Sequence, residues 1–200
     1  MELFVATSNA HKIIELSPAL PDHRLKLPAE AGFPNFEVEE DGRSYLDNAL
    51  KKALALYRLT ARPSIADDSG LDVRALGGAP GVISARYGSP DGKTKLTAAE
   101  RNAFLLRNMA GHSDRACAFV CCLVLVISEE RLFVVQETCP GELLYEPMGS
   151  GGFGYDPVVY LPDFGRTVAQ LSLEEKNQVS HRGRACARMM AILREVESKP

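Results

Sequence analysis

Two adjacent carboxylates, Asp67 and Asp68, are the side chains whose spacing most directly indicates chemistry in this chain. They end a short apolar run and are followed at once by Ser69 and Gly70. Adjacent carboxylates raise each other's proton affinity unless a cation lies between them. Mg²⁺ prefers oxygen ligands of this kind and often bridges to phosphates. The pattern predicts the end of a strand that presents acids to a divalent metal, although a solvated turn has the same composition.

A second acidic pair, Glu39 and Glu40, lies in the segment of residues 37–42. Together with Asp67 and Asp68 it would complete a shell of oxygen ligands around a metal, provided that the two segments meet in space. The alternative is a solvated acidic loop.

The residues around Lys12 indicate a phosphate site at a junction between a strand and a helix. Thr7, Ser8 and Asn9 are good helix-capping residues. The free N–H groups at the start of a helix bind phosphate well, and Lys12 adds a positive charge one turn further on. The Walker A pattern is absent from the sequence. The alternative is a capped helix in which Lys12 pairs with Glu15.

The glycine-rich segment of residues 149–157 carries Phe153, Tyr155 and Asp156. Glycine offers little cover, so we expect both aromatic rings to be exposed. An exposed ring beside a carboxylate suits a planar heterocycle, which would stack on Phe153 or Tyr155 while Asp156 reads its edge. The alternative is a tight turn with the rings folded into the core.

A basic group of residues lies inside or beside the last helix: Lys176, Ser180, His181 and Arg182. Side chains of this kind hold phosphates or a base carbonyl, and His181 could act as a general acid or base. Gly183 follows, and we expect the helix to break or kink there. The alternative is a solvated helix face.

Alternating strand and helix signals predict an α/β fold with a mixed, twisted sheet. The expected strands are residues 3–6, 25–27, 64–67, 71–76, 116–128, 132–138, 158–161 and, as a strand or an extended segment, 168–171. Residues 116–128 and 132–138 should form an antiparallel hairpin. Helices are expected to begin near Ala10, Ser44, Thr97 and Ser172, the last three with capping boxes. The second of these helices should bury one stripe of side chains, made of Leu46, Ala49, Leu50, Ala53, Leu54 and Tyr57.

Length and composition indicate one globular domain over residues 1–200. The chain is 46% hydrophobic and 24% charged, with a formal net charge of −3. It therefore has no basic excess for binding a nucleic-acid polymer. No apolar run reaches membrane-spanning length, and the first residues do not resemble a signal peptide. The number of cysteines, 5, is odd, and the chain has no C-x-x-C pair. Reduced, mostly buried thiols in a cytoplasmic protein are expected, and a zinc site is not.

Several of these segments occur in one order along nearly the whole chain: T-S-N-x-x-K-x-x-E, E-E-D-G, A-D-D-S-G, G-G-A-P-G, G-G-F-G-Y-D-P and S-H-R-G. This order resembles the inosine triphosphate pyrophosphatase family, also called XTP/dITP diphosphatases. The resemblance implies an elongated mixed sheet flanked by helices in two lobes, with a nucleotide cleft between them, and a homodimer. It also implies Mg²⁺-dependent hydrolysis of non-standard purine nucleoside triphosphates to a monophosphate and pyrophosphate.

The resemblance also implies roles for particular residues. Asp68 matches the catalytic acid, which serves as general base or metal ligand, and Glu40 matches a metal-binding acid. Substrate contacts are implied for Thr7, Ser8, Asn9, Ala10, His11 and Lys12 around the triphosphate, for Ser69, and for Phe153, Gly154, Tyr155, Asp156, Lys176, His181 and Arg182 around the purine. Of these, Ala10 and His11 would contribute backbone amides only.

Two other functions fit parts of the pattern. One is a related pyrophosphatase acting on pyrimidine or methylated nucleotides. The other is a nucleotide-binding regulator without turnover, which would need no water-activating carboxylate.

Overall fold

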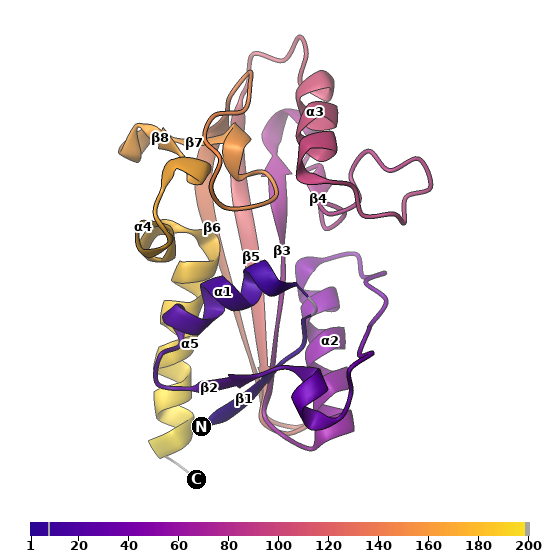
Figure 1. Ribbon diagram of the computed structural model, residues 1–200, viewed down its shortest axis with the longest axis vertical. Coiled ribbons are helices and arrows are strands. Elements are labelled where there is room, and N and C mark those ends of the chain that lie inside the picture. Colours follow the sequence, from indigo (N-terminus) through magenta and orange to yellow (C-terminus); the bar gives the residue numbers. More distant parts are fainter. Residues whose placement is uncertain (8, 199–200) are drawn as a thin grey trace. The chain divides into compact units, whose positions relative to one another are not determined.

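The computed structural model describes residues 1–7 and 9–198. It divides into two compact units (Figure 1). Unit 1 comprises Met1–Asp68, Cys121–Glu137 and the chain from Arg182 onward. Unit 2 comprises Ser69–Val120 and Thr138–His181.

A mixed sheet runs through the chain and confirms the predicted α/β class. Its strands are β1 (Glu2–Val5), β2 (Arg24–Lys26), β3 (Ser64–Val73), β4 (Pro80–Gly81), β5 (Ala116–Val126), β6 (Leu132–Leu143), β7 (Val159–Leu161) and β8 (Arg166–Thr167). Their order is β2-β1-β3-β5-β6-β7-β8, with β4 beside β3. Strand β1 pairs in parallel with β2 and β3, whereas β4 on β3, β7 on β6 and β8 on β7 are antiparallel.

Five α-helices accompany the sheet in the described residues: α1 (Ala10–Ala19), α2 (Tyr45–Thr60), α3 (Ala98–Asn108), α4 (Leu173–Val179) and α5 (His181–Ser198). Short 3-10 turns occupy Pro28–Ala31, Arg74–Leu76, Asp156–Val158, Pro162–Phe164 and Val168–Gln170. The predicted capping boxes are confirmed at Ser44, Thr97 and Ser172. Each leaves fewer unsatisfied N–H groups at the first turn of its helix.

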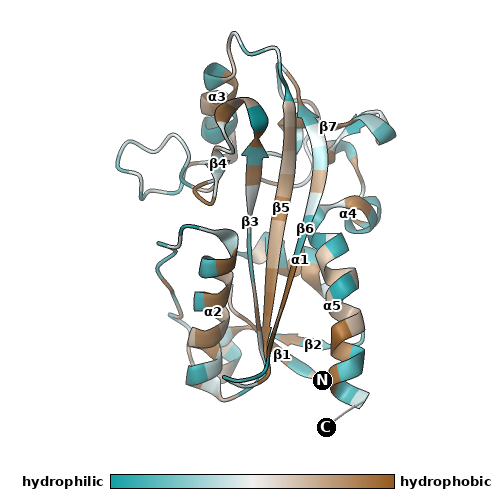
Figure 2. Ribbon diagram, turned by 180° about the vertical axis from the view of Figure 1, so that it is seen from behind, coloured by the Kyte–Doolittle hydropathy of each residue, from teal (hydrophilic) through white to brown (hydrophobic). Residues whose placement is uncertain are grey.

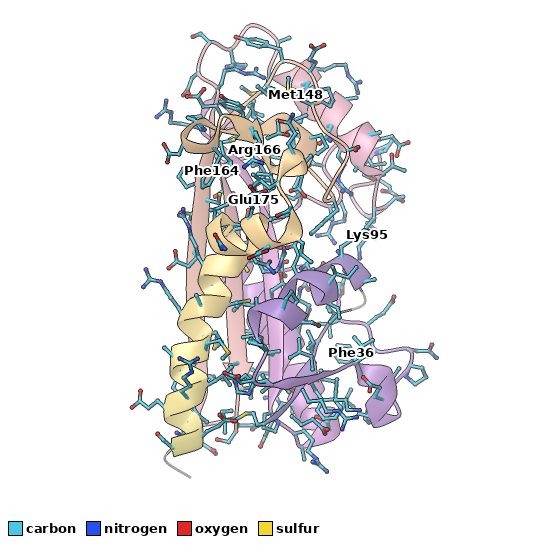
Figure 3. The ribbon with its side chains drawn as sticks, turned by 60° about the vertical axis from the view of Figure 1, so that its left-hand side comes forward. Phe36, Lys95, Met148, Phe164, Arg166 and Glu175 are labelled. Atoms are coloured by element: carbon cyan, nitrogen blue, oxygen red, sulfur yellow. The ribbon has the colours of Figure 1, made fainter. Side chains whose placement is uncertain are left out.

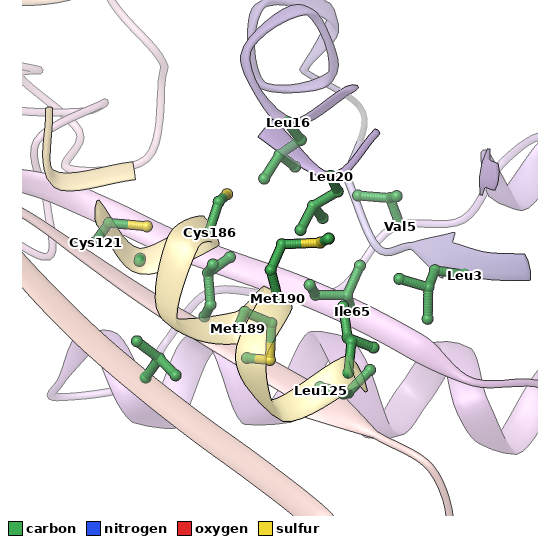
Figure 4. Packing of buried hydrophobic residues seen from close by; sticks show 14 residues of the cluster. Leu3, Val5, Leu16, Leu20, Ile65, Cys121, Leu125, Cys186, Met189 and Met190 are labelled. Atoms are coloured by element: carbon green, nitrogen blue, oxygen red, sulfur yellow. The ribbon is translucent and has the colours of Figure 1, made fainter. Parts of the chain in front are cut away.

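The side chains of each strand point alternately to the two faces of the sheet, and this divides unit 1 into layers. The odd-numbered side chains Val5, Ile65 and Leu123 face a buried cluster that includes Leu16 of α1 and Met189 of α5 (Figure 4). Successive side chains of a strand point to opposite faces, so the even-numbered ones face the other way. Helix α2 lies on that second side of β3, opposite α1 and α5 (Figure 1). The sheet of unit 1 is therefore covered on both faces.

Strand β5 shows the consequence of this double cover. All its residues from Phe119 to Val126 are buried, and Figure 2 colours much of this strand as hydrophobic. A strand buried on both faces has a continuous apolar sequence rather than an alternating one. The turn that follows confirms the predicted hairpin connection, because Ile127 N–H donates to the Arg131 carbonyl at 2.9 Å and β6 lies beside β5.

Unit 2 has its own apolar core. Leu71 and Val73 of β3 pack there with Leu105 of α3, Phe119 of β5 and Val159 of β7. The core therefore joins strands β3, β5 and β7 to helix α3.

The structure corrects three predicted boundaries. The run from Ser64 to Val73 is one strand, so the two aspartates lie in the middle of β3 rather than at the end of a strand. Residues 168–170 form a 3-10 turn instead of a strand. The expected last helix is divided at Ser180, whose extended backbone ends α4, and Gly183 lies inside α5 without breaking it.

Five buried cysteines are all free thiols, as predicted. Among residues 1–7 and 9–198, no helix combines the length and the apolar character needed to cross a membrane.

Candidate active site

Asp67 and Asp68 are neighbours in sequence but face different helices, because alternate side chains of β3 point to opposite faces. Asp67 belongs to the face covered by α1 and α5. Its carboxylate lies 3.0 Å from Lys12 Nζ and accepts hydrogen bonds from Arg182 Nε at 3.2 Å and Nη2 at 2.9 Å. Burial alone would raise the pKa of Asp67, but the charges of Lys12, Arg182 and Lys52 outweigh it and hold this pKa far below its usual range. Asp67 is therefore ionised at neutral pH.

Arg182 is the counter-ion of this face. It is 1% exposed, and its Nη1 also donates to Glu15 of α1. Burial would lower the pKa of Arg182, but Asp67 and Glu15 raise it above its usual value. Both carboxylates hold the guanidinium of Arg182 inside unit 1, and its place beside a purine stays a prediction. The alternative pair of Lys12 with Glu15 is likewise replaced by Lys12 with Asp67 and Arg182 with Glu15.

Asp68 faces helix α2 and meets a different set of groups. Asn48 Nδ2 donates to its Oδ2 at 3.0 Å, and Lys52 Nζ lies 3.6 Å from its Oδ1. Burial raises the pKa of Asp68 above its usual value, although Lys52, Lys12 and the Asn48 hydrogen bond act in the opposite direction. Asp68 is thus the more basic of the two aspartates.

Lys52 contacts the acidic side chains on this side of β3. Its Nζ donates to Glu40 Oε1 at 2.5 Å and to the Asp67 carbonyl at 2.8 Å. Burial would lower the pKa of Lys52, but Asp68 and Glu40 outweigh this effect and raise it. The ammonium group shows that positive charge is stabilised between Glu40 and Asp68.

The expected four-acid metal shell does not form. Glu39 is exposed, and Asp67 points to the opposite face from Asp68. In the part of the chain that the structure describes, no group of three or more His, Cys, Asp or Glu side chains could hold a metal ion. Glu40 and Asp68 do converge, on Lys52. Since Mg²⁺ is commonly bound through one or two carboxylates together with substrate phosphates, this pair fits such an ion in number and chemistry.

The predicted buried stripe of α2 is correct at Ala49 and Ala53 but does not include Asn48 and Lys52, which are buried as well. The buried residues of this helix are Tyr45, Asn48, Ala49, Lys52, Ala53 and Leu56, whereas Leu46 is 39% exposed. Residues 45, 49, 52 and 56 follow helical spacing, and Asn48 and Lys52 lie four residues apart on that stripe. The helical spacing was therefore present in the sequence, but the prediction counted only apolar residues as buried and so left out Asn48 and Lys52.

The start of α1 has the predicted capping geometry. Asn9 Oδ1 accepts the His11 N–H at 3.0 Å, and Thr7 Oγ1 accepts the Asn9 N–H at 3.1 Å. Ala10 and His11 are exposed, so this end of the helix is open to a ligand. Ser8, predicted to contact phosphate, lies outside the described residues. Ser69, the next residue after Asp68, is half-buried.

In unit 2, Asp156 organises the glycine-rich segment. Its Oδ2 accepts the Phe153 N–H at 2.7 Å and Lys176 Nζ at 2.6 Å. A Cβ on Gly152 would lie 2.0 Å from that oxygen, and its φ of +69° also favours glycine. Lys176 Nζ stands 4.8 Å from the centre of the Phe153 ring. Phe153, Asp156 and Lys176 thus come together as predicted.

Tyr155 departs from the prediction, because its ring is buried rather than exposed. It belongs to the core of unit 2, and its hydroxyl donates to the Ser84 carbonyl at 2.9 Å. Burial raises the pKa of Tyr155 well above its usual value. A ring in this position anchors the segment, whereas Phe153 is half-buried. Gly154, between the two rings, has its carbonyl held by Asn102 Nδ2 at 3.2 Å.

Two further contacts hold Arg166 and His181, also in unit 2. Arg166 Nη2 and Glu175 Oε1 are 2.7 Å apart beside α4, the helix that carries Lys176 (Figure 3). His181 is buried and stacks on Phe119, with ring centroids 4.9 Å apart and an interplanar angle of 13°. The stacking sets the plane of the imidazole.

On this mixed sheet, two convergent carboxylates beside lysines supply the kinds of group that enzymes acting on nucleoside phosphates use to hold Mg²⁺ and phosphate. A protein from Treponema denticola named dITP/XTP pyrophosphatase is 45% identical over 185 residues, which are 92% of this chain and 94% of that protein. The solved Ham1 protein of Coxiella burnetii matches with a TM-score of 0.87 and 36% identity, over 98% of this chain and 99% of that one. The Ham1 protein of Staphylococcus aureus matches with a TM-score of 0.86 and 35% identity, over the same shares of the two chains. The Ham1 family model matches residues 3–192, and the chain belongs to this family.

Proposed function

We propose that this chain hydrolyses non-standard purine nucleoside triphosphates, namely ITP, dITP and XTP, to the nucleoside monophosphate and pyrophosphate. The names of its relatives support this substrate class. The observation that carries the proposal is the environment of Asp68, a buried carboxylate whose pKa is raised and which lies beside Glu40 and Lys52.

Unit 1 supplies the groups for phosphate. Lys12 and Lys52 stand on the two sides of β3, and the start of α1 adds backbone N–H groups to their charges. Glu40 and Asp68 would hold a divalent cation, Mg²⁺ in our proposal, which when bound neutralises charge on phosphate oxygens and on the pyrophosphate leaving group.

Asp68 is the proposed general base. A carboxylate with a raised pKa takes a proton from water more readily than an ordinary one. Asn48 holds one of its oxygens, and the other faces Lys52. Asp67, with its strongly lowered pKa, is unsuited to accept a proton and serves instead as the counter-ion of Lys12 and Arg182.

Unit 2 supplies the groups for the base. Phe153 offers an aromatic face, and Lys176 offers donors that suit a 6-oxo purine. The 6-amino group of adenine cannot accept from such a donor, and a mismatched buried polar group costs about 1–3 kcal/mol. We also propose that His181 contacts the base as a hydrogen-bond donor. Arg182 acts indirectly, through its contacts with Asp67 and Glu15.

We further propose that the protein is a homodimer that acts in the cytoplasm on small nucleotides, with no nucleic-acid polymer as partner. Five free thiols are consistent with a reducing compartment.

The test is the release of pyrophosphate and orthophosphate from ITP, XTP, GTP, ATP and dTTP, with Mg²⁺ and with a chelator. We expect metal-dependent pyrophosphate from ITP and XTP and little from ATP or GTP. Pyrophosphate mainly from dTTP would favour the related pyrimidine pyrophosphatases. No release of either product would leave a nucleotide-binding protein without turnover.

The variant Asp68→Asn tests the general base. We expect kcat to fall far more than nucleotide binding weakens, because the amide keeps the shape but cannot accept the proton. Turnover near that of the wild type would remove Asp68 from this role.

A further inference from the structure

Asn48 joins two parts of the site that are far apart in the sequence. Its side-chain Oδ1 accepts the Gly42 N–H at 2.8 Å, and its Nδ2 donates to Asp68 Oδ2 at 3.0 Å. Gly42 lies two residues after Glu40, on the segment that leads into α2. One amide thus connects the Glu40 segment to the carboxylate of Asp68.

The two hydrogen bonds fix each other's direction. Gly42 N–H is a donor, so it requires the amide oxygen, and the NH₂ group must then face the acceptor Asp68 Oδ2. Asn48 is 1% exposed, so neither bond is shared with bulk water. Its place on α2 is itself fixed, since the Asn48 N–H donates to the Ser44 carbonyl at 3.3 Å.

The backbone at residue 42 is shaped around this contact. A Cβ on Gly42 would lie 2.6 Å from Asn48 Oδ1 and 2.6 Å from Asp47 Cβ. Real Cβ atoms do not approach so closely, and both neighbours belong to helix α2. The absence of a side chain at residue 42 is therefore a requirement of the Asn48 bridge, and this observation is independent of the Asp68 bond.

We propose that Asn48 is a positioning residue that holds Glu40 and Asp68 at one mutual distance and turns Asp68 Oδ1 toward Lys52. The inference rests on the proposed function only in so far as these two acids act together. A group that orients metal-binding or catalytic side chains in this way changes affinity or activity by about 10–100-fold when it is removed.

Three variants separate this role from a merely structural one. Asn48→Leu keeps much of the volume and removes both hydrogen bonds. Gly42→Ala leaves the amide in place and displaces the Glu40 segment. Ser44→Ala is the control, because it removes the cap of the same helix, whose Oγ accepts the Asp47 N–H at 3.1 Å, and touches neither acid.

Each variant is measured in two ways. The first is the dissociation constant for Mn²⁺ alone, from the paramagnetic resonance signal of the free ion in the absence of nucleotide. The second is kcat and KM for ITP, with the thermal midpoint as a check of folding.

We expect Asn48→Leu to lower kcat by about tenfold or more and to weaken Mn²⁺ binding by a similar factor, with a KM for ITP close to that of the wild type. Gly42→Ala should weaken Mn²⁺ binding in the same direction. Ser44→Ala should lower the thermal midpoint and leave both other quantities unchanged.

Two results would overturn the inference: a folded Asn48→Leu protein that keeps kcat and Mn²⁺ affinity within about twofold of the wild type, or a Ser44→Ala protein that loses as much as Asn48→Leu. If the wild type binds Mn²⁺ but releases no pyrophosphate, the proposed function fails and the Mn²⁺ comparison alone decides the role of Asn48. A wild type that binds no Mn²⁺ would refute the positioning role as well.

Discussion

Replacing Arg182 with methionine should destabilise the protein strongly, because this side chain is the buried counter-ion of two carboxylates. In the folded state Arg182 donates to Asp67 and Glu15, which are 1% and 4% exposed. The variant fills the space but leaves both acids without the guanidinium. Breaking a buried ion pair by removing one partner costs about 3–5 kcal/mol. For a chain of this size, that corresponds to a fall of about 6–20 °C in the thermal midpoint.

The pH dependence of this loss has a definite sign. The folded-state pKa of Asp67 is lowered from its ordinary value of 3.8, so its contribution to stability is full above that value and is lost as the pH falls toward the folded-state pKa. Without Arg182 the pKa of Asp67 is lowered less. The difference in unfolding free energy between wild type and Arg182→Met should therefore be full both at pH 7 and at pH 4, and should become smaller only below pH 3.8, the ordinary pKa of the carboxyl.

The chain offers a matched control in Arg74, which also forms a two-bond pair with a carboxylate. Arg74 Nε and Nη2 lie 2.6 and 2.8 Å from the two oxygens of Asp114, but the arginine side chain is 74% exposed. Arg74→Met should therefore change the unfolding free energy far less than Arg182→Met, because solvent already screens the pair.

The assay is urea denaturation of the three proteins at pH 7 and pH 4, followed by circular dichroism. An Arg182→Met protein that is no less stable than Arg74→Met at pH 7 would refute the role of Arg182 as a buried counter-ion. A deficit of Arg182→Met that is already much smaller at pH 4 than at pH 7 would refute the reasoning as well.

Three further outcomes are expected. Lys176→Met should raise KM for ITP more than it lowers kcat, because it removes the cation beside Phe153 and Asp156. A fall in kcat alone in steady-state assays would contradict the proposed role of Lys176 in binding the base. Phe119→Leu should raise KM for ITP by about two- to tenfold by removing the ring stacked on His181, as the energy of an aromatic pair suggests, and an unchanged KM would show that stacking is not needed. Burial raises the pKa of two buried cysteine thiols to about 12 and of a third to about 11, so a disulfide reagent at pH 8 should label the native protein slowly and the urea-unfolded protein at all five thiols. Rapid labelling of native protein would contradict that burial. The thiols with these values are Cys117, Cys186 and Cys122.

Much of the fold follows from local signals in the sequence. The caps at Asn9, Ser44, Thr97 and Ser172 mark helix starts correctly, because a capping side chain acts on N–H groups only two or three residues away. The site is different. That Asp67 and Asp68 lie inside one strand depends on the partners of β3, and a run of Asp, Ser and Gly has turn composition wherever it occurs.

The partners of the charged residues could be predicted less well than their positions. Lys12 and Glu15 are close enough in sequence to pair with each other, yet each pairs with a residue from another element. The prediction that the Tyr155 ring is exposed was wrong, because nearby glycines give no information about the core that the ring enters. Such choices are made by tertiary packing and are absent from local sequence.

Whether an aspartate of β3 faces α1 and α5 or faces α2 depends on its odd or even position along the strand. This limits which insertions and deletions the gene can accept. The strand is anchored to β1, with Phe4 opposite Ser64 and Val5 opposite Ile65. Inserting or deleting one codon between residues 65 and 67 would turn the second aspartate toward α1 and α5 and the first toward α2. Substitutions in this stretch can be tested one by one by selection, but a change of length reassigns both acids at once. The spacing from the β1 pairing to Asp68 is therefore as strict a constraint as the acids themselves.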